Sequence, residues 1–342
     1  MCSYGHSYSG MTSAVATVLS AAQAEAAAAG GATTVRYALG SGINKPAGAG
    51  GLAAAANLSA WADLTLLVVG LGCIEAEGRD RFNLTLSAAQ AALVAAVSAS
   101  APASSRLVIA VASAGGVDLV EPRADALLQI FYNGEETGTG LWDVLLGRVP
   151  PSARMPETVY AWQYLGLVAP EINFNMVTMG VGRTYRFFNN SAAVAASGGA
   201  QDSYIRYRFG YGLSYCSFAY SGLQLAALPN GTVSVSVDVA AVAPAGLACR
   251  EVTQVYLTLP PVPGLVTPIY SLVAFAATQL PPAGAPPTRV SLLVGADDLK
   301  TTAVDGTRAL TGGAYTFAVG GHLPDDEKGA AQSNVVVGVV QL

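Results

Sequence analysis

A short apolar run followed by a densely charged loop constrains the fold of this chain most. Residues 64–70 (LTLLVVG) are too few to span a membrane and are typical of a buried parallel strand. Residues 71–81 carry five charged side chains, in a chain that is only 11% charged. A helix is expected over residues 87–99, with Ser87 as its N-cap. Because ligand groups collect where the strands of open α/β sheets end, this loop is the expected functional centre.

Length and charge exclude several classes of function. A chain of 342 residues is long enough for two domains, each with its own core. The net charge is −5 and Lys and Arg form no cluster, so nucleic acid is not expected as a partner. No apolar run reaches the 18 or so residues that a bilayer requires, so a membrane is not expected either. The first six residues lack the basic start and apolar stretch of a signal peptide.

The cysteines and histidines give no pattern for a metal site. Two histidines are present, and no two of the four cysteines have C-x-x-C spacing. A zinc site or a Ser-His-Asp triad is therefore not expected, and no metal or cofactor is predicted. The cysteines are compatible with disulfides, but the sequence does not determine their pairing. They are Cys2, Cys73, Cys216 and Cys249.

Four N-glycosylation sequons favour a secreted protein. One sequon is weak evidence, since sequons occur by chance, but four together favour a secreted protein. The missing signal peptide conflicts with this, and we expect the chain to be the later portion of a longer secreted polypeptide. The candidate glycosylation sites are Asn57, Asn83, Asn189 and Asn230.

The first part of the chain alternates helices and strands. Helices are expected at 11–29 and 52–62, and strands at 33–39, 107–112 and 126–132. Together with the strand 64–70 and the helix 87–99, this alternation predicts an α/β sandwich with a mostly parallel sheet and helices on both faces. Residues 133–215 are loops rich in Gly, Arg and aromatic residues, and most of these aromatics are expected in core and interdomain packing.

The last part of the chain is predicted to be all β. Residues 232–239 alternate apolar and polar side chains, as a half-buried antiparallel strand does. Pro- and Gly-rich turns separate further short strands, which is typical of a β-sandwich. The expected domains are an α/β domain at 1–216, a linker at 217–231 and a sandwich at 232–342. The further strands are predicted at 252–259, 271–275, 290–294, 314–319 and 335–340.

Several motifs together resemble the C-terminal half of glycoside hydrolase family 3, and its β-xylosidase branch in particular. Their order along the chain is the family's order, and the resemblance covers nearly the whole chain. The tail resembles the fibronectin type III-like domain that closes many of these enzymes. The matching segments are 62–63 (AD), 75–81 (EAEGRDR), 131–138 (FYNGEETG), 143–147 (DVLLG), 151–158 (PSARMPET), 182–186 (GRTYR), 209–215 (FGYGLSY) and, in the tail, 251–257 (EVTQVYL).

The resemblance implies an enzyme lineage but only half of its catalytic apparatus. Family members carry, before this region, a (β/α)-barrel that supplies an aspartate nucleophile and most of the sugar-binding pocket. Nothing upstream of residue 60 matches such a barrel. The implied partners are a carbohydrate, a β-xyloside or a related glycan, and a barrel domain on an upstream or separate polypeptide. By itself the chain is expected to be inactive. The resemblance also implies an extracellular or cell-wall location, reached through the secretory pathway.

Within the charged loop, the resemblance places the acid/base of a retaining glycosidase on Glu77. Retaining glycosidases use two carboxyl groups, one as nucleophile and one as acid/base. Glu75 is the local rival, because a loop does not determine which of two near neighbours points at the substrate. Arg79, Asp80 and Arg81 are predicted to shape the loop, with Asp80 and Arg81 as a pair. The structural alternative is that Glu75, Glu77 and Asp80 only pair with Arg79 and Arg81 on a solvated loop.

The sequence leaves two hypotheses for the function, one an enzyme and the other a protein without catalysis. The first is the C-terminal part of a β-xylosidase-like exo-glycosidase that hydrolyses O-glycosyl bonds, for example in xylan breakdown. The second is a carbohydrate-binding or structural module, without catalysis, derived from such an enzyme. The sequence upstream of Met1 in the transcript discriminates between them, because it either continues in frame into a barrel or does not.

Overall fold

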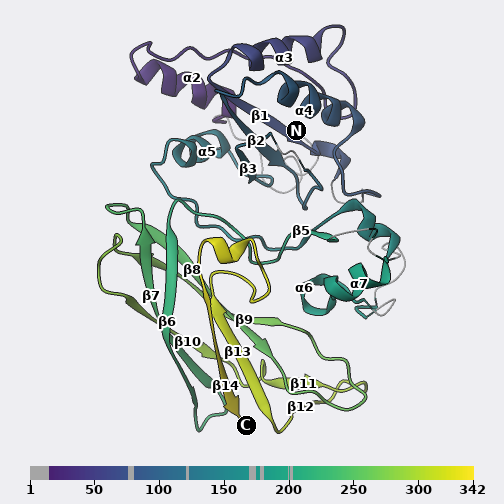
Figure 1. Cartoon of the computed structure of the whole chain (residues 1–342), viewed down its shortest axis with the longest axis vertical. Helices are drawn as coiled ribbons and strands as arrows, with labels where there is room; N and C mark the ends of the chain where they lie inside the picture. Colours follow the sequence, from purple (N-terminus) through teal and green to yellow (C-terminus); the bar gives the residue numbers. More distant parts are fainter. Residues whose placement is uncertain are drawn as a thin grey trace. The chain divides into compact units, whose positions relative to one another are not determined.

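A computed structural model gives the fold of the chain (Figure 1). It describes residues 15–75, 81–120, 123–168, 175–177, 181–198, 200 and 203–342. The chain divides into two compact units, residues 1–149 and residues 150–342.

The first unit is built on a parallel sheet of three strands in the order β1-β2-β3. The strands are β1 (Leu64–Gly70), β2 (Arg106–Ala112) and β3 (Ala126–Gln129). Both pairings are parallel, with Ile109 of β2 opposite Leu67 on one side and Leu127 on the other. The central strand is buried from Leu107 to Val111, which explains its continuous apolar sequence. The predicted parallel sheet is confirmed.

Helices α3 (Gly51–Trp61) and α4 (Ala88–Ser100) pack on one face of this sheet. Leu93 and Val97 of α4 join Leu67 and Ile109 in one buried apolar cluster. The Ser87 hydroxyl accepts the Gln90 N–H at 3.3 Å, so the predicted N-cap is confirmed.

The helices α2 (Val18–Ala28) and α5 (Thr137–Leu145) form a second pair in this unit. Trp142 donates its indole N–H to the Val18 carbonyl at 3.0 Å. A Cβ at Gly138 would lie 2.3 Å from the Thr17 carbonyl oxygen, so only glycine allows this close approach.

The structure differs from the sequence prediction at two strands. Residues 34–40 form no ladder with any described strand, so the predicted strand 33–39 is wrong. Tyr37 and Leu39 stay exposed there, and Arg36 stacks on Trp61 with 4.1 Å from its guanidinium carbon to the ring centroid. The strand predicted at 126–132 already ends at Gln129, because Phe131 adopts a φ of 50° that no strand permits.

The second unit begins with short elements around an aromatic cluster. The strands β4 (Val159–Tyr160) and β5 (Ile205–Tyr207) pair antiparallel. Tyr164 stacks on Tyr160 and meets the Phe188 ring edge-on, and Tyr164 and Phe188 are buried. Aromatic side chains from this loop-rich segment thus form a core, as predicted. The remaining elements here are η2 (Trp162–Gly166), α6 (Thr184–Phe187) and α7 (Asn190–Ala196).

The rest of this unit is a sandwich of two antiparallel sheets, β10-β7-β6 and β14-β13-β8-β9. Alternate valines of β7, from Val233 to Val239, face Val255 of β8 and Phe317 of β13 in one core. The predicted all-β sandwich is confirmed, and its fibronectin type III-like assignment stays a prediction. The strands are β6 (Ser217–Ala227), β7 (Val233–Ala243), β8 (Cys249–Thr258), β9 (Ser271–Leu280), β10 (Thr288–Val294), β13 (Ala314–Gly320) and β14 (Val335–Gln341), with β11 (Lys300–Thr302) and β12 (Arg308–Leu310) as a separate hairpin.

The predicted linker 217–231 contains a strand. β6 occupies Ser217–Ala227 and pairs with β7 along its length. The division between compact units also falls after Val149, whereas the predicted domain boundary is at 216. The reason is that residues 150–216 make buried polar contacts with the sandwich.

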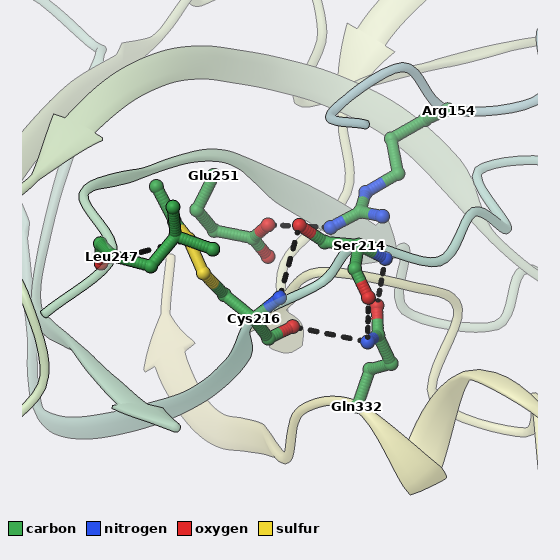
Figure 2. The surroundings of a disulfide bond; sticks show 7 residues. Arg154, Ser214, Cys216, Leu247, Glu251 and Gln332 are labelled. Atoms are coloured by element: carbon green, nitrogen blue, oxygen red, sulfur yellow. Dashed lines mark hydrogen bonds and ion pairs between the residues drawn. A yellow bond between two sulfur atoms is a disulfide. The ribbon is translucent and has the colours of Figure 1, made fainter. Parts of the chain in front are cut away.

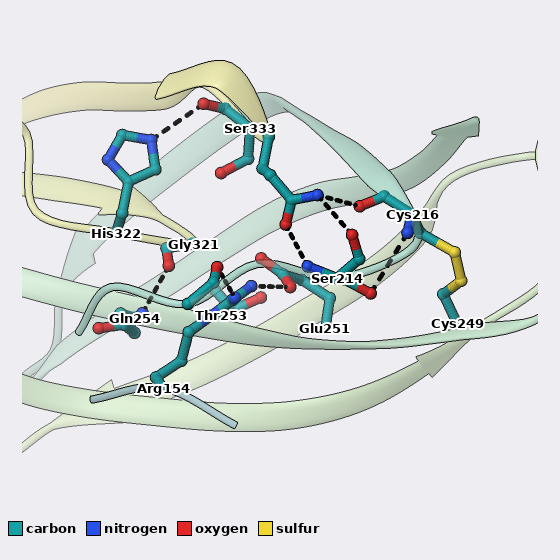
Figure 3. A network of polar contacts seen from close by, with 12 residues as sticks. Arg154, Ser214, Cys216, Cys249, Glu251, Thr253, Gln254, Gly321, His322 and Ser333 are labelled. Atoms are coloured by element: carbon teal, nitrogen blue, oxygen red, sulfur yellow. Dashed lines mark hydrogen bonds and ion pairs between the residues drawn. A yellow bond between two sulfur atoms is a disulfide. The ribbon is translucent and has the colours of Figure 1, made fainter. Parts of the chain in front are cut away.

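An ion pair between Arg154 and Glu251 anchors this segment to the sandwich (Figures 2 and 3). The Glu251 side chain is fully buried, and its second oxygen accepts the Tyr220 hydroxyl at 2.8 Å. Arg154 also donates to the Gly212 carbonyl. Burial raises the pKa of Glu251, and the Arg154 guanidinium opposes that rise.

A disulfide and an amide side chain lie next to this ion pair (Figure 2). Cys216 is bonded to Cys249, which settles a pairing that the sequence left open, and both residues are buried. The Gln332 amide donates to the carbonyls of Ser214 at 2.8 Å and Cys216 at 3.0 Å, and its oxygen accepts the Ser214 N–H.

Among the described helices, none is long and apolar enough to cross a bilayer.

We expect Glu251 to make the stability of the second unit depend on pH. Because its pKa is higher in the folded protein than its ordinary value of 4.5, the folded state binds the proton more tightly than the unfolded chain. This contribution is full below pH 4.5 and is lost as pH rises through the raised pKa. The unfolding free energy of the wild type, measured with urea across this range, should fall with rising pH relative to Glu251→Gln.

The exposed Glu327 provides the matched control for this measurement. Glu327→Gln should follow the wild-type pH dependence. Parallel curves for the wild type and Glu251→Gln would contradict the assignment of a raised pKa to Glu251.

Candidate active-site loop

The charged loop begins where β1 meets the end of β2. The Leu71 N–H donates to the Ala112 carbonyl at 3.0 Å, one residue beyond the last ladder pair. A Cβ at Gly70 would lie 2.0 Å from that carbonyl oxygen, so glycine is required at this crossing. The chain then forms the 3-10 helix η1 (Gly72–Ile74) and reaches Glu75. The loop is thus at the carboxyl edge of the parallel sheet, as predicted.

Glu75 and Arg81 form an ion pair that joins the two sides of the loop. Arg81 Nε donates to Glu75 Oε1 at 2.9 Å, and Arg81 Nη2 donates to the Gly116 carbonyl at 2.8 Å. The other Glu75 oxygen accepts backbone N–H groups from Ala114 at 2.9 Å and Gly115 at 3.4 Å. The Glu75 side chain is only 17% exposed and the Arg81 side chain only 11%. Glu75 is therefore a structural carboxylate that ties the loop to the end of β2.

The other predicted site residues belong to positions 76–80. Glu77, Arg79 and Asp80 lie outside the described residues, and so does the predicted Asp80–Arg81 pair. Their roles stay predictions. Of the loop-shaping residues, Arg81 has contacts of the expected kind, although its carboxylate partner is Glu75.

Gln90 is a positioning residue that the sequence prediction missed. Its buried amide accepts the Gly70 N–H at 2.7 Å and donates to the carbonyls of Gly70 at 2.5 Å and Ile43 at 3.2 Å. It therefore satisfies the backbone at the point where β1 ends. A signal was present in the sequence, because Ser87 and Gln90 have the spacing of a capping box.

Tyr132 supports the same loop from the segment after β3. Its hydroxyl donates to the Gly72 carbonyl at 2.8 Å. Burial and the negative charge of Glu75 raise the pKa of Tyr132, so the hydroxyl stays protonated as a donor.

A hollow of about 260 Å³ lies beside the described part of the loop. Arg81 and the exposed Phe82 line it, together with Leu71 and Asn83. Among the residues that the structure describes, no group of three or more His, Cys, Asp or Glu is arranged to hold a metal ion.

Comparison with known proteins identifies the family. Residues 4–215 match the Glycosyl hydrolase family 3 C-terminal domain, so the chain belongs to this family and the predicted resemblance is confirmed. A Beta-xylosidase/alpha-L-arabinofuranosidase 2 from Medicago sativa subsp. varia is 34% identical over 175 residues, which cover 48% of this chain and 20% of that protein. Beta-D-xylosidase 1 from Arabidopsis thaliana is 35% identical over 196 residues, covering 55% of this chain and 23% of that protein.

Solved structures agree on the fold. The GH3 beta-glucosidase of Bifidobacterium adolescentis superposes with a TM-score of 0.78 at 23% identity, over 100% of this chain and 48% of that one. Beta-glucosidase 3B of Thermotoga neapolitana gives a TM-score of 0.71 at 21% identity, over 97% of this chain and 47% of that one. The chain thus spans about half the length of these two enzymes and less than a quarter of the two plant relatives.

We expect Glu75→Ala to loosen the loop. The change removes the ion pair and leaves the Ala114 and Gly115 N–H groups without their acceptor, at a cost of about 1–3 kcal/mol in unfolding free energy. Hydrogen exchange at these two amides should become faster. The exposed Glu136 gives the control, because Glu136→Ala should change the unfolding free energy by less than about 0.5 kcal/mol. Equal effects of the two variants would show that Glu75 does not hold the loop.

Proposed function

We propose that this chain is the C-terminal part of a β-xylosidase-like exo-glycosidase and that Glu77 is its general acid/base. Membership of glycosyl hydrolase family 3 supports the glycosidase class. The names of the two plant relatives support β-xylosides as substrates. The solved structures named above are β-glucosidases and show only the fold, so the choice of xylose rests on the relatives' names.

The hydrogen bonds and the ion pair that Glu75 makes are the observation that supports Glu77 as the acid/base. A general acid must present its proton to the leaving group and take one back from water. Glu75 accepts hydrogen bonds from Arg81, Ala114 and Gly115, so both of its carboxylate oxygens are already engaged by donors. A residue held in this way is poorly suited to donate a proton. Of the two rival glutamates, Glu77 is therefore the better candidate.

The proposed reaction needs a second carboxylate. In a retaining glycosidase the nucleophile and the acid/base are about 5–5.5 Å apart, and the nucleophile forms a covalent glycosyl-enzyme intermediate. We assign the nucleophile to a barrel domain on an upstream or separate polypeptide. In this scheme Glu77 first protonates the leaving oxygen and then deprotonates the water that releases the sugar.

The purified 342-residue chain should not turn over an aryl β-xyloside or an aryl β-glucoside. A site with one carboxylate cannot form the glycosyl-enzyme intermediate. Release of the aryl alcohol is the measurement, with Glu77→Gln as the control for contaminating glycosidases. Activity of the purified chain that disappears in Glu77→Gln would contradict the proposal that the nucleophile lies on a separate barrel domain.

In an assembly that includes the barrel, Glu77→Gln should act selectively on poor leaving groups. The loss in kcat/KM should be about 10²–10⁴-fold for an alkyl or unactivated aryl β-xyloside. For a dinitrophenyl xyloside, which leaves without a proton, glycosyl-enzyme formation should slow much less. Glu75→Gln is the matched control and should affect both substrates to a similar extent. Equal losses on both substrates in Glu77→Gln would remove Glu77 from the acid role.

A further inference from the structure

The four sequons occupy different structural contexts. Asn57 lies inside helix α3, and the hydroxyl of its sequon serine, Ser59, is buried and donates to the Val97 carbonyl at 3.1 Å. Asn189 is the N-cap of α7, where its side-chain oxygen accepts the Ala192 N–H at 2.9 Å. In these two sequons a residue of the motif already contributes to the fold.

Asn83 and Asn230 lie in exposed turns, but their surroundings differ. Asn83 lines the hollow of about 260 Å³ beside the candidate active-site loop, so a glycan there would crowd that hollow. Asn230 lies in the hairpin turn between β6 and β7, on the sandwich in the second unit.

The turn at Asn230 is well defined. The Gly231 N–H donates to the Leu228 carbonyl at 3.0 Å, and the Leu228 N–H donates to the Thr232 carbonyl at 2.9 Å. Gly231 has a φ of 79°, which favours glycine, and Pro229 precedes the asparagine. The sequon is thus held at the tip of a closed hairpin.

The amide oxygen of Asn230 is hydrogen-bonded, whereas its amide nitrogen makes no hydrogen bond within the described part of the chain. Its oxygen accepts both the backbone N–H of Thr232 at 3.2 Å and the Thr232 hydroxyl at 2.8 Å. Asn230 is exposed, and its amide nitrogen donates no hydrogen bond to any residue that the structure describes. Substitution at this nitrogen would therefore break no contact of the described fold.

The disulfide supplies an independent argument about the compartment. Cys216 and Cys249 flank the β6–β7 hairpin in sequence, and their bond is buried in the sandwich core. Disulfides of this kind form in oxidising compartments, and the secretory pathway of eukaryotes is where N-linked glycans are attached. The disulfide and the sequon at Asn230 are therefore both compatible with maturation of this sandwich in the secretory pathway.

We propose that Asn230 carries an N-linked glycan that is attached in the secretory pathway. In this reaction Asn230 Nδ2 forms a bond to the anomeric carbon of a lipid-pyrophosphate-linked oligosaccharide. The bond between that carbon and the pyrophosphate oxygen breaks, the lipid pyrophosphate leaves, and the amide loses one proton. This proposal does not depend on the glycosidase function.

Expression of the full chain behind a secretion leader in a eukaryotic host tests the proposal. Peptide mass spectrometry after amidase deglycosylation should find aspartate at position 230. Asn230→Gln and Thr232→Ala should each remove one glycan mass from the intact protein, whereas Thr232→Ser should retain it. Asn57→Gln is the matched control, because it changes a sequon whose serine is buried, and it should leave the glycan mass unchanged.

The disulfide is the internal control for the route. Non-reducing peptide mapping shows whether Cys216 and Cys249 are joined in the secreted protein. Protein that contains this disulfide and an unmodified Asn230 would overturn the proposal. An equal glycan mass in the wild type and in Asn230→Gln would overturn it as well.

Discussion

The ion pair between Glu75 and Arg81 is the interaction on which the candidate site depends. The two residues bracket positions 76–80, and both are held by backbone groups that follow β2. Gln90 and Tyr132 add hydrogen bonds to the Gly70 and Gly72 carbonyls. The start of the loop is thereby fixed by strands, a helix and charged side chains together. Precise positioning of this kind is what an acid/base on a loop requires from its supporting residues.

The chain uses glutamates for different purposes, and the surroundings of each decide its role. Glu251 is fully buried, pairs with Arg154, and joins residues 150–216 to the sandwich. Glu75 is partly exposed and accepts from a guanidinium and two backbone amides. Both are committed to structure, which supports the assignment of proton transfer to Glu77. Removing either structural carboxylate would leave a buried or half-buried guanidinium without its partner, which is a costly change.

The sequence predicted those elements that depend only on neighbouring residues, such as strand periodicity and helix capping. The strand at 64–70, the N-cap at Ser87 and the alternating strand β7 follow directly from periodicity and capping. The strand β6 was missed because a bulge at Gly222 reverses its apolar alternation, with Phe218 and Tyr220 inward before it and Leu223 and Leu225 packed on the core after it. The Ala114 amide that donates to Glu75 lies 39 residues away in sequence, and the Cys249 that is bonded to Cys216 lies 33 residues away, so only the fold brings these pairs together. The motif assigned Glu77 through the family alone, and no pattern within the loop separated it from Glu75.

Rescue by azide tests the central claim most directly. In an assembly of this chain with its barrel, azide can replace the deprotonated water and attack the glycosyl-enzyme intermediate without a general base. We expect azide to accelerate turnover of an activated β-xyloside by Glu77→Ala and to yield a β-xylosyl azide, whereas turnover by Glu75→Ala should not increase. Rescue of Glu75→Ala with no rescue of Glu77→Ala would contradict the account and reverse the roles of the two glutamates.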